Sequence, residues 1–168
     1  MKEFITYLFE DDGSIPNNPD LPLLVYPDAL EDNQTKAEAC KKLLESNGWS
    51  NAWVNGIFSY HHYHSTTHEV LAVINGSAMV KMGGEEGEEL SISEGDAIVI
   101  PAGVGHRLLT SSNDFRVVGA YPGGRSYDLC TGEATERPQV LSNIKNVPLP
   151  EQDPVSGNKN PLYKYWLE

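Results

Sequence analysis

Apolar and polar residues alternate along the middle of the chain in a pattern that predicts short β-strands. Alternation with a period of two places successive side chains on opposite faces of a strand, so that one face can be buried. Turn-forming pairs such as Asn75-Gly76 separate the alternating segments. The pattern therefore predicts an all-β sandwich or barrel, with strands at 53–64, 69–75, 77–82, 88–93, 96–100, 106–111 and 115–121.

The N-terminal part of the chain carries a different pattern. Residues 3–10 and 23–26 predict two further strands, and the polar and proline-containing residues 11–22 between them predict a loop. Apolar residues then recur at helical spacing and predict one helix over Thr35–Asn47. Cys40 lies on the apolar side of this helix, so we expect its thiol to be buried.

The C-terminal part returns to proline and polar residues with isolated apolar positions. This composition predicts that residues 135–168 form an ordered arm that wraps the barrel, and it motivates the hypothesis that the arm closes the barrel mouth as a lid. We expect one domain over 1–168, because a chain of this length can bury a core of its own. Within it we expect an N-terminal strand and helix extension (1–52), a barrel core (53–122), and remaining strands with the wrapping arm (123–168).

Some of the predicted strands are apolar on both faces, which indicates that their outer face is covered. The segment Ala97-Ile-Val-Ile100 is an example. The helix, the N-terminal strand or a second subunit would provide this cover. We therefore expect a homodimer.

Charge and composition exclude several classes of protein. The formal net charge is −12, from 12 Lys and Arg against 24 Asp and Glu, and we expect no nucleic-acid partner because no basic cluster is present. No apolar run approaches the ~20 residues that cross a bilayer, and the N-terminal apolar run is too short for a signal peptide. Cys40 and Cys130 form neither a disulfide framework nor a close-spaced metal pair. We expect a cytoplasmic protein with no membrane partner.

All five histidines lie within residues 61–106, and this clustering indicates a metal site. Neutral imidazole is the commonest metal ligand in proteins. His62 and His64 are two residues apart, so on a strand both side chains point to the same face. Glu69 follows a short polar turn and begins the return strand, and His106 comes in a second block, after a proline and two glycines.

These two blocks resemble the two conserved motifs of the cupin superfamily. The first block contains Gly56, His62, His64, Glu69 and Gly76, and the second contains Gly95, Pro101, Gly103 and His106. The family pattern ends with an asparagine where this sequence has Thr110, a position of strand-end packing rather than of the metal shell. Four stretches further resemble the small YjlB-like cupins: His64–Glu69, Pro101–His106, Gly119–Pro122 and Asp153–Gly157.

The resemblance implies a double-stranded β-helix, a jelly-roll barrel with one N-terminal helix and a C-terminal arm, and a divalent metal ion at its mouth. Carried over position by position, it implies that the ligands are His62, His64, Glu69 and His106. Three imidazoles and one carboxylate leave coordination positions open, which suits Fe, Mn, Ni or Cu better than a closed structural Zn site. A small-molecule ligand or substrate, water or dioxygen would bind at the open positions.

Other residues near the two blocks have interpretations of their own. His61 should face away from His62 and lie at the surface or an interface. His68 adjoins Glu69 in the turn, and we expect it to be a solvated turn residue rather than a support for the metal ligands. Phe58 and Tyr60 share the face of His62, and they would line a substrate pocket or fill the barrel.

We expect no functional role for three further features, namely Arg107, residues 83–87 and Cys130. Arg107 alternates away from His106 and is not assigned to the site. The glycine-rich run 83–87 is acidic and lacks lysine, so it predicts a turn rather than a phosphate-binding loop. Cys130 lies near Asp128 with no base or cation beside it, so we expect an unreactive thiol.

The sequence leaves three classes of function open and assigns no catalytic residue. The first is a dioxygenase-like, metal-dependent oxidoreductase that acts on a small organic acid, enol or phenol. The second is a metal-dependent isomerase or epimerase of a sugar or keto acid, which needs a base that we do not identify. The third is a non-enzymatic protein that binds a small ligand. The barrel cannot choose among them, because one fold hosts many activities.

Overall fold

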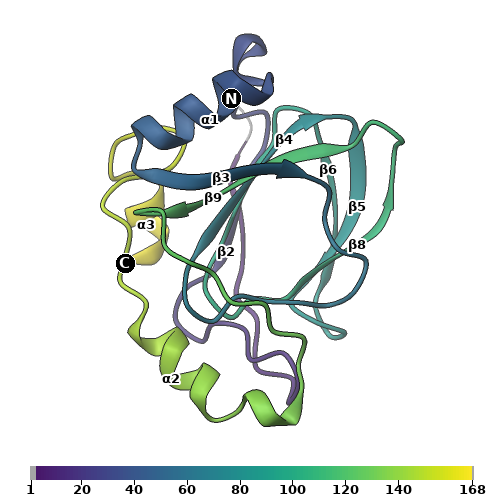
Figure 1. The fold of residues 1–168 in the computed structure, drawn as a ribbon, viewed down its shortest axis with the longest axis vertical. Coiled ribbons are helices and arrows are strands. Elements are labelled where there is room, and N and C mark those ends of the chain that lie inside the picture. The colour runs from purple at the N-terminus through teal and green to yellow at the C-terminus, as the bar shows by residue number, and fades with distance from the viewer. Residues whose placement is uncertain (1–2, 168) are drawn as a thin grey trace.

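The computed structural model describes residues 3–167 and contains two antiparallel sheets that face each other (Figure 1). The larger sheet has the strand order β1-β2-β7-β4-β9-β3 and the smaller has the order β6-β5-β8. The bounds are β1 Ile5–Tyr7, β2 Leu23–Tyr26, β3 Trp49–Asn55, β4 Glu69–Asn75, β5 Ser77–Met82, β6 Glu88–Ser93, β7 Ala97–Ile100, β8 His106–Ser111 and β9 Arg116–Pro122. This arrangement confirms the predicted all-β jelly-roll class.

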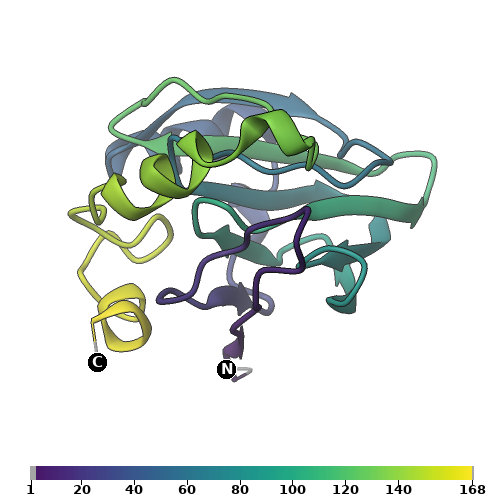
Figure 2. The same ribbon diagram turned by 90° about the horizontal axis from the view of Figure 1, so that it is seen from below.

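Three short helices surround the sheets. Helix α1 (Ala37–Ser46) and helix α3 (Leu162–Trp166) lie outside the larger sheet, and helix α2 (Gln139–Asn146) lies at one end of the barrel (Figures 1 and 2). Two single 3-10 turns, η1 (Asp32–Gln34) and η2 (Ala134–Glu136), complete the list. The helix predicted over Thr35–Asn47 is confirmed as α1, with the Cys40 thiol buried.

Two apolar cores lie on the two faces of the larger sheet, and β4 contributes to both. Leu71 and Val73 face the smaller sheet and join the core inside the barrel. Val70 and Ala72 face outward and join a second core that α1 and α3 cover. The chain itself therefore supplies the cover that strands with two apolar faces require.

The strand predicted at 53–64 is wrong in its bounds. Strand β3 starts earlier, at Trp49, and ends at Asn55, where the Asn55 side chain accepts a hydrogen bond from the Gly56 amide. Residues 56–61 are irregular, and only His62 and Tyr63 form isolated bridges, to His106 and Cys130. His62 and Tyr63 therefore pair with His106 and Cys130, whereas β3 before them pairs with β9.

The C-terminal arm wraps the barrel, but it is more helical than predicted and adds no named strand within residues 123–167. Its anchor is the buried carboxylate of Asp153, which accepts hydrogen bonds from the Tyr26 hydroxyl at 2.6 Å and from the Leu162 amide at 3.2 Å. The Trp166 indole donates to the Pro22 carbonyl at 2.9 Å. These contacts hold the arm against the outer face of the larger sheet.

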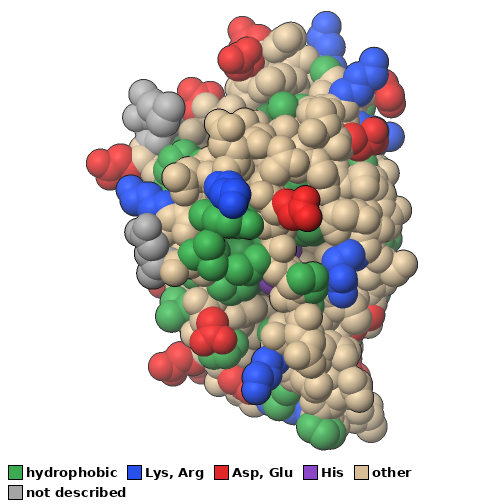
Figure 3. Space-filling view, turned by 90° about the vertical axis from the view of Figure 1, so that its left-hand side faces the viewer, with side chains coloured by type: hydrophobic (Ala, Val, Ile, Leu, Met, Phe, Trp, Pro, Cys, Tyr) green, Lys and Arg blue, Asp and Glu red, His purple; other side chains and the backbone are tan. Residues whose placement is uncertain are grey.

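The surface around the arm carries no concentration of one charge. Figure 3 shows acidic and basic side chains scattered over this face around a patch of hydrophobic side chains.

Within residues 3–167, no helix has the length and apolar character that crossing a membrane requires.

Candidate metal centre

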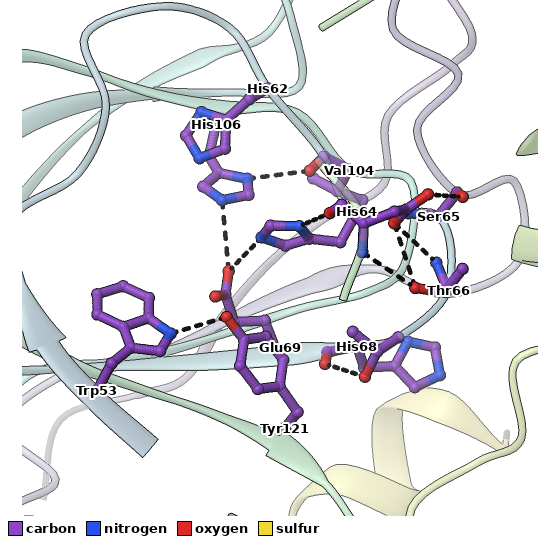
Figure 4. A network of polar contacts seen from close by, with 12 residues as sticks. Trp53, His62, His64, Ser65, Thr66, His68, Glu69, Val104, His106 and Tyr121 are labelled. Atoms are coloured by element: carbon purple, nitrogen blue, oxygen red, sulfur yellow. Dashed lines mark hydrogen bonds and ion pairs between the residues drawn. The ribbon is translucent and has the colours of Figure 1, made fainter. Parts of the chain in front are cut away.

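The site lies where the two sheets meet, because each sheet contributes a residue from the start of one strand. Glu69 is the first residue of β4 in the larger sheet and pairs with Ile100 of β7. His106 is the first residue of β8 in the smaller sheet and pairs with Met82 of β5. Glu69 Oε1 lies 3.4 Å from His106 Nε2 and 3.5 Å from His64 Nε2 (Figure 4). All three side chains are buried, and their ligand atoms form one group that can hold a metal ion.

His62 and His64 come from the irregular segment that precedes β4. The His62 amide donates to the His106 carbonyl at 3.2 Å, and the His106 amide donates to the His62 carbonyl at 2.9 Å. This two-way pairing places their side chains side by side, with ring centroids 4.0 Å apart. His62 therefore adjoins the cluster of His64, Glu69 and His106 without belonging to the tight group.

In His62, His64 and His106, a hydrogen bond from Nδ1 to a backbone carbonyl sets the tautomer of the imidazole. A backbone carbonyl only accepts, so a ring nitrogen in contact with one must carry the proton. His62 Nδ1 lies 3.0 Å from the Tyr60 carbonyl, His106 Nδ1 lies 3.2 Å from the Val104 carbonyl, and His64 Nδ1 contacts the Asp128 carbonyl. Each neutral ring thus keeps its lone pair on Nε2. Metal-binding histidines are typically oriented by such a bond at the second nitrogen.

The donor set fits a cation. Glu69 is 1% exposed, and its Oε1 atom has no hydrogen-bond partner among the described residues. Burial acts to raise the pKa of Glu69, but the imidazoles of His64 and His106 together lower it by more than burial raises it. The net pKa is therefore below its usual range, and the carboxylate is ionised. A buried charge of this kind needs a counter-charge, and nitrogen lone pairs beside it suit a divalent metal ion.

The pKa values of His64 and His62 shift in opposite directions. Burial acts to lower the pKa of His64, but the charge and hydrogen bond of Glu69 together with the Asp128 contacts outweigh it, and the net pKa is raised. Burial lowers the pKa of His62 to about 3, so this ring is neutral. A proton on His64 and a metal ion therefore compete for the same lone pair, as in other sites where ligands must deprotonate.

The loop that carries His106 is held by the N-terminal loop. Gly103 has a φ of 92°, and a Cβ at this position would overlap the Asn17 carbonyl. Asn17 Oδ1 accepts from the Gly105 amide at 3.1 Å, and Asn18 Nδ2 donates to the Ala102 carbonyl at 3.1 Å. The motif glycine thus permits a close backbone approach that places His106.

Asp128 holds the segment that orients His64. Its carboxylate accepts from the Ser65 amide at 2.7 Å, from the Ser65 hydroxyl, and from the Thr66 hydroxyl at 3.2 Å. Its carbonyl accepts from His64 Nδ1. One residue therefore fixes both the backbone next to His64 and the direction of the His64 ring. Nothing in the local sequence distinguished Asp128 from other loop aspartates, because its role depends on a contact across 64 positions of the chain.

A cavity of about 490 Å³ opens beside the cluster, and all four predicted ligands lie in its lining. Its walls are mainly apolar and aromatic. The Trp53 indole donates to the Tyr121 hydroxyl at 2.8 Å and packs over Gly119, which faces it across β3 and β9. Burial, and then the charge of Glu69, raise the pKa of Tyr121 well above its usual range, so its phenol is neutral.

The cavity also contains residues that the sequence analysis missed. Tyr121 shares strand parity with Val117, an inner-core residue, so alternation along β9 held the signal that would have placed it inside. Tyr127 and Leu129 line the cavity from the irregular segment after β9, where no periodic pattern exists. Leu129 is the last residue of the chain in this lining, so the arm beyond it does not form a lid in this structure.

The structure corrects the interpretation of His68. This side chain is 1% exposed rather than solvated, because the turn packs beneath the arm. His68 Nδ1 accepts from the Ala102 amide at 2.9 Å, and its ring lies edge-on to Trp166 with centroids 4.8 Å apart. Burial lowers the pKa of His68 to about 3. The residue supports the loop before His106 from the outer side of the sheet.

Phe58 and Tyr60 do not point inward from a strand, because their segment is irregular. Both are exposed, and their rings stack with centroids 5.0 Å apart. Phe58 lines the rim of the cavity, and Tyr60 packs on Phe58 and edge-on to His62. His61 points away from the site to Glu85, at 2.9 Å.

The remaining interpretations concern residues outside the cluster. Arg107 is not in the cavity lining, and residues 83–87 form the turn between β5 and β6. Cys130 is buried and donates to Asp128 at 3.3 Å, and burial raises the pKa of its thiol to about 12. The thiol is therefore protonated at neutral pH, as expected for an unreactive cysteine.

Comparisons with known proteins place this fold and site in context. Residues 52–119 match the family model described as "Cupin domain". The uncharacterized protein YjlB of Bacillus subtilis is 48% identical over 167 residues, which cover 99% of this chain and 99% of YjlB.

Two solved structures are more remote. The WlaRB TDP-quinovose 3,4-ketoisomerase of Campylobacter jejuni is 13% identical, with a TM-score of 0.42, over 49% of this chain and 69% of that one. The acireductone dioxygenase of Bacillus anthracis, with cadmium in its active centre, is 19% identical, with a TM-score of 0.39, over 73% of this chain and 79% of that one. Neither likeness assigns a ligand or a reaction to this chain.

Proposed function

The chain belongs to the cupin family, in which it shares nearly its whole length with YjlB, and on this premise we propose that it is a metal-dependent oxidoreductase. We propose that it binds one divalent metal ion and acts, like a dioxygenase, on a small organic molecule. The observation that carries this proposal is the set of Nε2 lone pairs that converge with the buried Glu69 carboxylate on the floor of the cavity.

The proposed ligands are His62, His64, Glu69 and His106. The group of His64, Glu69 and His106 supports three of them directly, and the neutral His62 ring beside His106 supports the fourth. When bound there, a redox-active divalent ion would supply Lewis-acid and electron-transfer chemistry at the cavity floor. The residues themselves would orient that ion, and the Glu69 carboxylate would offset one of its two charges.

The composition of the cavity favours an oxidoreductase over an isomerase. An isomerase that moves a proton on its substrate needs a base with a pKa near neutrality. Among the described lining residues, the carboxylates and imidazoles all belong to the proposed ligand set. Tyr121 lies beside them, and its raised pKa makes it a hydrogen-bond or proton donor rather than a base.

The experiment that tests this proposal is the metal content of untagged protein, measured by elemental mass spectrometry. We expect a stoichiometric redox-active metal in the wild type and its loss in both His64→Ala and Glu69→Gln. The matched control is His61→Ala, whose ring pairs with the exposed Glu85 outside the cavity and should leave the metal content unchanged.

Oxygen uptake with small phenols, enols and acids then tests the reaction class. Uptake that depends on both the metal and the substrate would support the oxidoreductase. Stoichiometric zinc with oxygen-independent turnover would replace it with isomerase chemistry. An absence of metal from the wild type would leave a non-enzymatic binding protein.

A further inference from the structure

We propose that the cavity selects neutral aromatic or otherwise apolar molecules that bear one oxygen function, and that it rejects molecules with a second, anionic group. This inference rests on the proposed function in one respect, because the oxygen would be directed to the metal centre. The rest of the argument depends only on the walls and the charge of the cavity.

The walls present flat, apolar surfaces. Trp53, Phe58, Tyr121 and Tyr127 line the cavity together with aliphatic side chains. Tyr121 and Tyr127 stack with ring centroids 4.7 Å apart, which forms one broad aromatic face next to the cluster. Such surfaces bind planar apolar groups through area burial and through offset-stacked or edge-to-face contacts.

The rim has the same character and is unusually exposed. Phe58 is 51% exposed, Tyr127 is 46% exposed and Leu129 is 48% exposed, and all three border the opening. Large apolar side chains gathered around an opening typically mark a site where a ligand covers them. An apolar ligand would remove this surface from water, whereas a charged tail at the rim would gain no partner.

The cavity contains no positive side chain to pair with a second anionic group. None of its lining residues within the described chain is lysine or arginine. Arg125 lies near Tyr127, but it donates to the Thr66 carbonyl at 3.1 Å and lines a separate hollow. The net charge of −12 for the chain also disfavours the approach of a further anion.

The walls have few polar groups, and the oxygen acceptors of two of them are already engaged. The Tyr121 hydroxyl accepts from the Trp53 indole at 2.8 Å, and the Asn55 side chain accepts from the Gly56 amide at 2.8 Å. A sugar or another molecule with many hydroxyls would therefore lose more hydrogen bonds to water than these walls can replace. Binding would depend on apolar contact, with the single oxygen at the cluster providing orientation.

Two probes of similar size test the inference. Isothermal titration calorimetry would compare para-cresol with para-hydroxybenzenesulfonate, which carries a sulfonate in place of the methyl group. We expect para-cresol to bind at least about tenfold more tightly. Equal affinity, tighter binding of the sulfonate, or no binding of para-cresol would overturn the inference.

Variants at the rim show whether charge causes the preference. Phe58→Arg places a cation at an exposed position that lines the cavity, and it should raise the affinity for the sulfonate while lowering that for para-cresol. Leu141→Arg, at an exposed position of α2 outside the cavity, is the matched control and should change neither affinity. An equal change in both variants would mean that the overall charge, rather than the cavity, sets the preference, and would overturn the inference.

The same titrations with metal-loaded and chelator-treated protein separate this inference from the proposed function. If no metal is bound but para-cresol is still preferred, the oxidoreductase proposal fails and the selectivity stands. If metal is bound stoichiometrically but the sulfonate binds as well as para-cresol, the selectivity fails and the metal site stands.

Discussion

At the scale of single residues, the candidate site consists of hydrogen-bond acceptors that face one another. The Nε2 atoms of His64 and His106 approach Glu69 Oε1 to within 3.5 and 3.4 Å. Their Nδ1 protons are committed to backbone carbonyls, so neither neutral ring can donate to the carboxylate. A proton or a metal ion between these atoms would satisfy both the Nε2 lone pairs and the carboxylate. Because the two compete for the same lone pairs, the affinity for metal should fall as the pH falls.

The buried histidines predict acid sensitivity of the metal-free protein, and His68 is the clearest case. Its folded-state pKa is lowered to about 3 from 6.5, so as the pH falls below about 6.5 the unfolded chain takes up a proton that the folded protein does not. The contribution of His68 to the free energy of unfolding is therefore retained above pH 6.5 and is lost as the pH falls from 6.5 toward 3. At pH 5 the loss due to His68 is about 2 kcal/mol in the free energy of unfolding.

Urea denaturation of chelator-treated protein at pH 7 and pH 5 measures this loss. His62 adds a loss of the same sign, and His64, whose pKa is raised, partly offsets it. The contribution of His68 is therefore the difference between the wild type and His68→Asn, whose side-chain oxygen can still accept from the Ala102 amide. An identical fall in stability for both proteins would contradict the prediction.

At the scale of elements, the C-terminal arm completes the larger sheet rather than the site. Helix α3 has only five residues, and it presents Leu162 and Trp166, one turn apart, to the outer core. Asp153 ties the start of this segment to Tyr26 of β2. The arm therefore contributes mainly to stability, and it contacts the surroundings of the site through Trp166, which packs on His68, and through Asn143, which donates to the Ser65 hydroxyl at 3.0 Å.

A pair of substitutions in the arm tests this division of roles. Leu162→Ala opens a cavity at a position that is 0% exposed and should lower the free energy of unfolding by about 2 to 5 kcal/mol. Leu167→Ala, at a neighbouring position that is 56% exposed, should change it by less than about 0.5 kcal/mol. Urea denaturation measures both effects, and we expect the metal content of the folded protein to be the same in both variants. Equal stability of the two would show that the arm does not support the outer core.

At the scale of the whole molecule, two sheets from one chain enclose a buried anionic centre and an apolar cavity. The outer face of the larger sheet, which suggested a second subunit, is covered by α1 and α3 of the same chain. This removes the argument for a homodimer that came from strands with two apolar faces. The homodimer and the cytoplasmic location stay predictions.

Light scattering coupled to size-exclusion chromatography at micromolar concentration tests the homodimer, for which we expect twice the mass of the chain. A dimer that is compatible with the proposed function must leave the rim around Phe58 and Leu129 open. The affinity for para-cresol should then be the same above and below the concentration at which the dimer dissociates. A monomeric mass at micromolar concentration would remove the homodimer.

Much of the fold followed from local pattern, because alternation reports which face of a strand is buried. Strands β2, β4, β5, β6 and β8 have the predicted bounds. The prediction failed where long-range pairing outweighed local pattern, as in residues 56–61. The two helices of the arm were missed because they are short, with eight and five residues, so neither repeats a helical pattern over enough turns to stand out.

The sequence by itself determined the residue types of the site and the motif spacing of His64, Glu69 and His106, whereas strand parity failed for His64, because its segment is irregular. Only the tertiary structure decided which groups surround them. It turned His68 inward, assigned the orientation of His64 to Asp128, and built the cavity from Tyr121 and Tyr127. These roles depend on contacts between segments far apart in the chain, and burial, pKa and selectivity arise only once those contacts form.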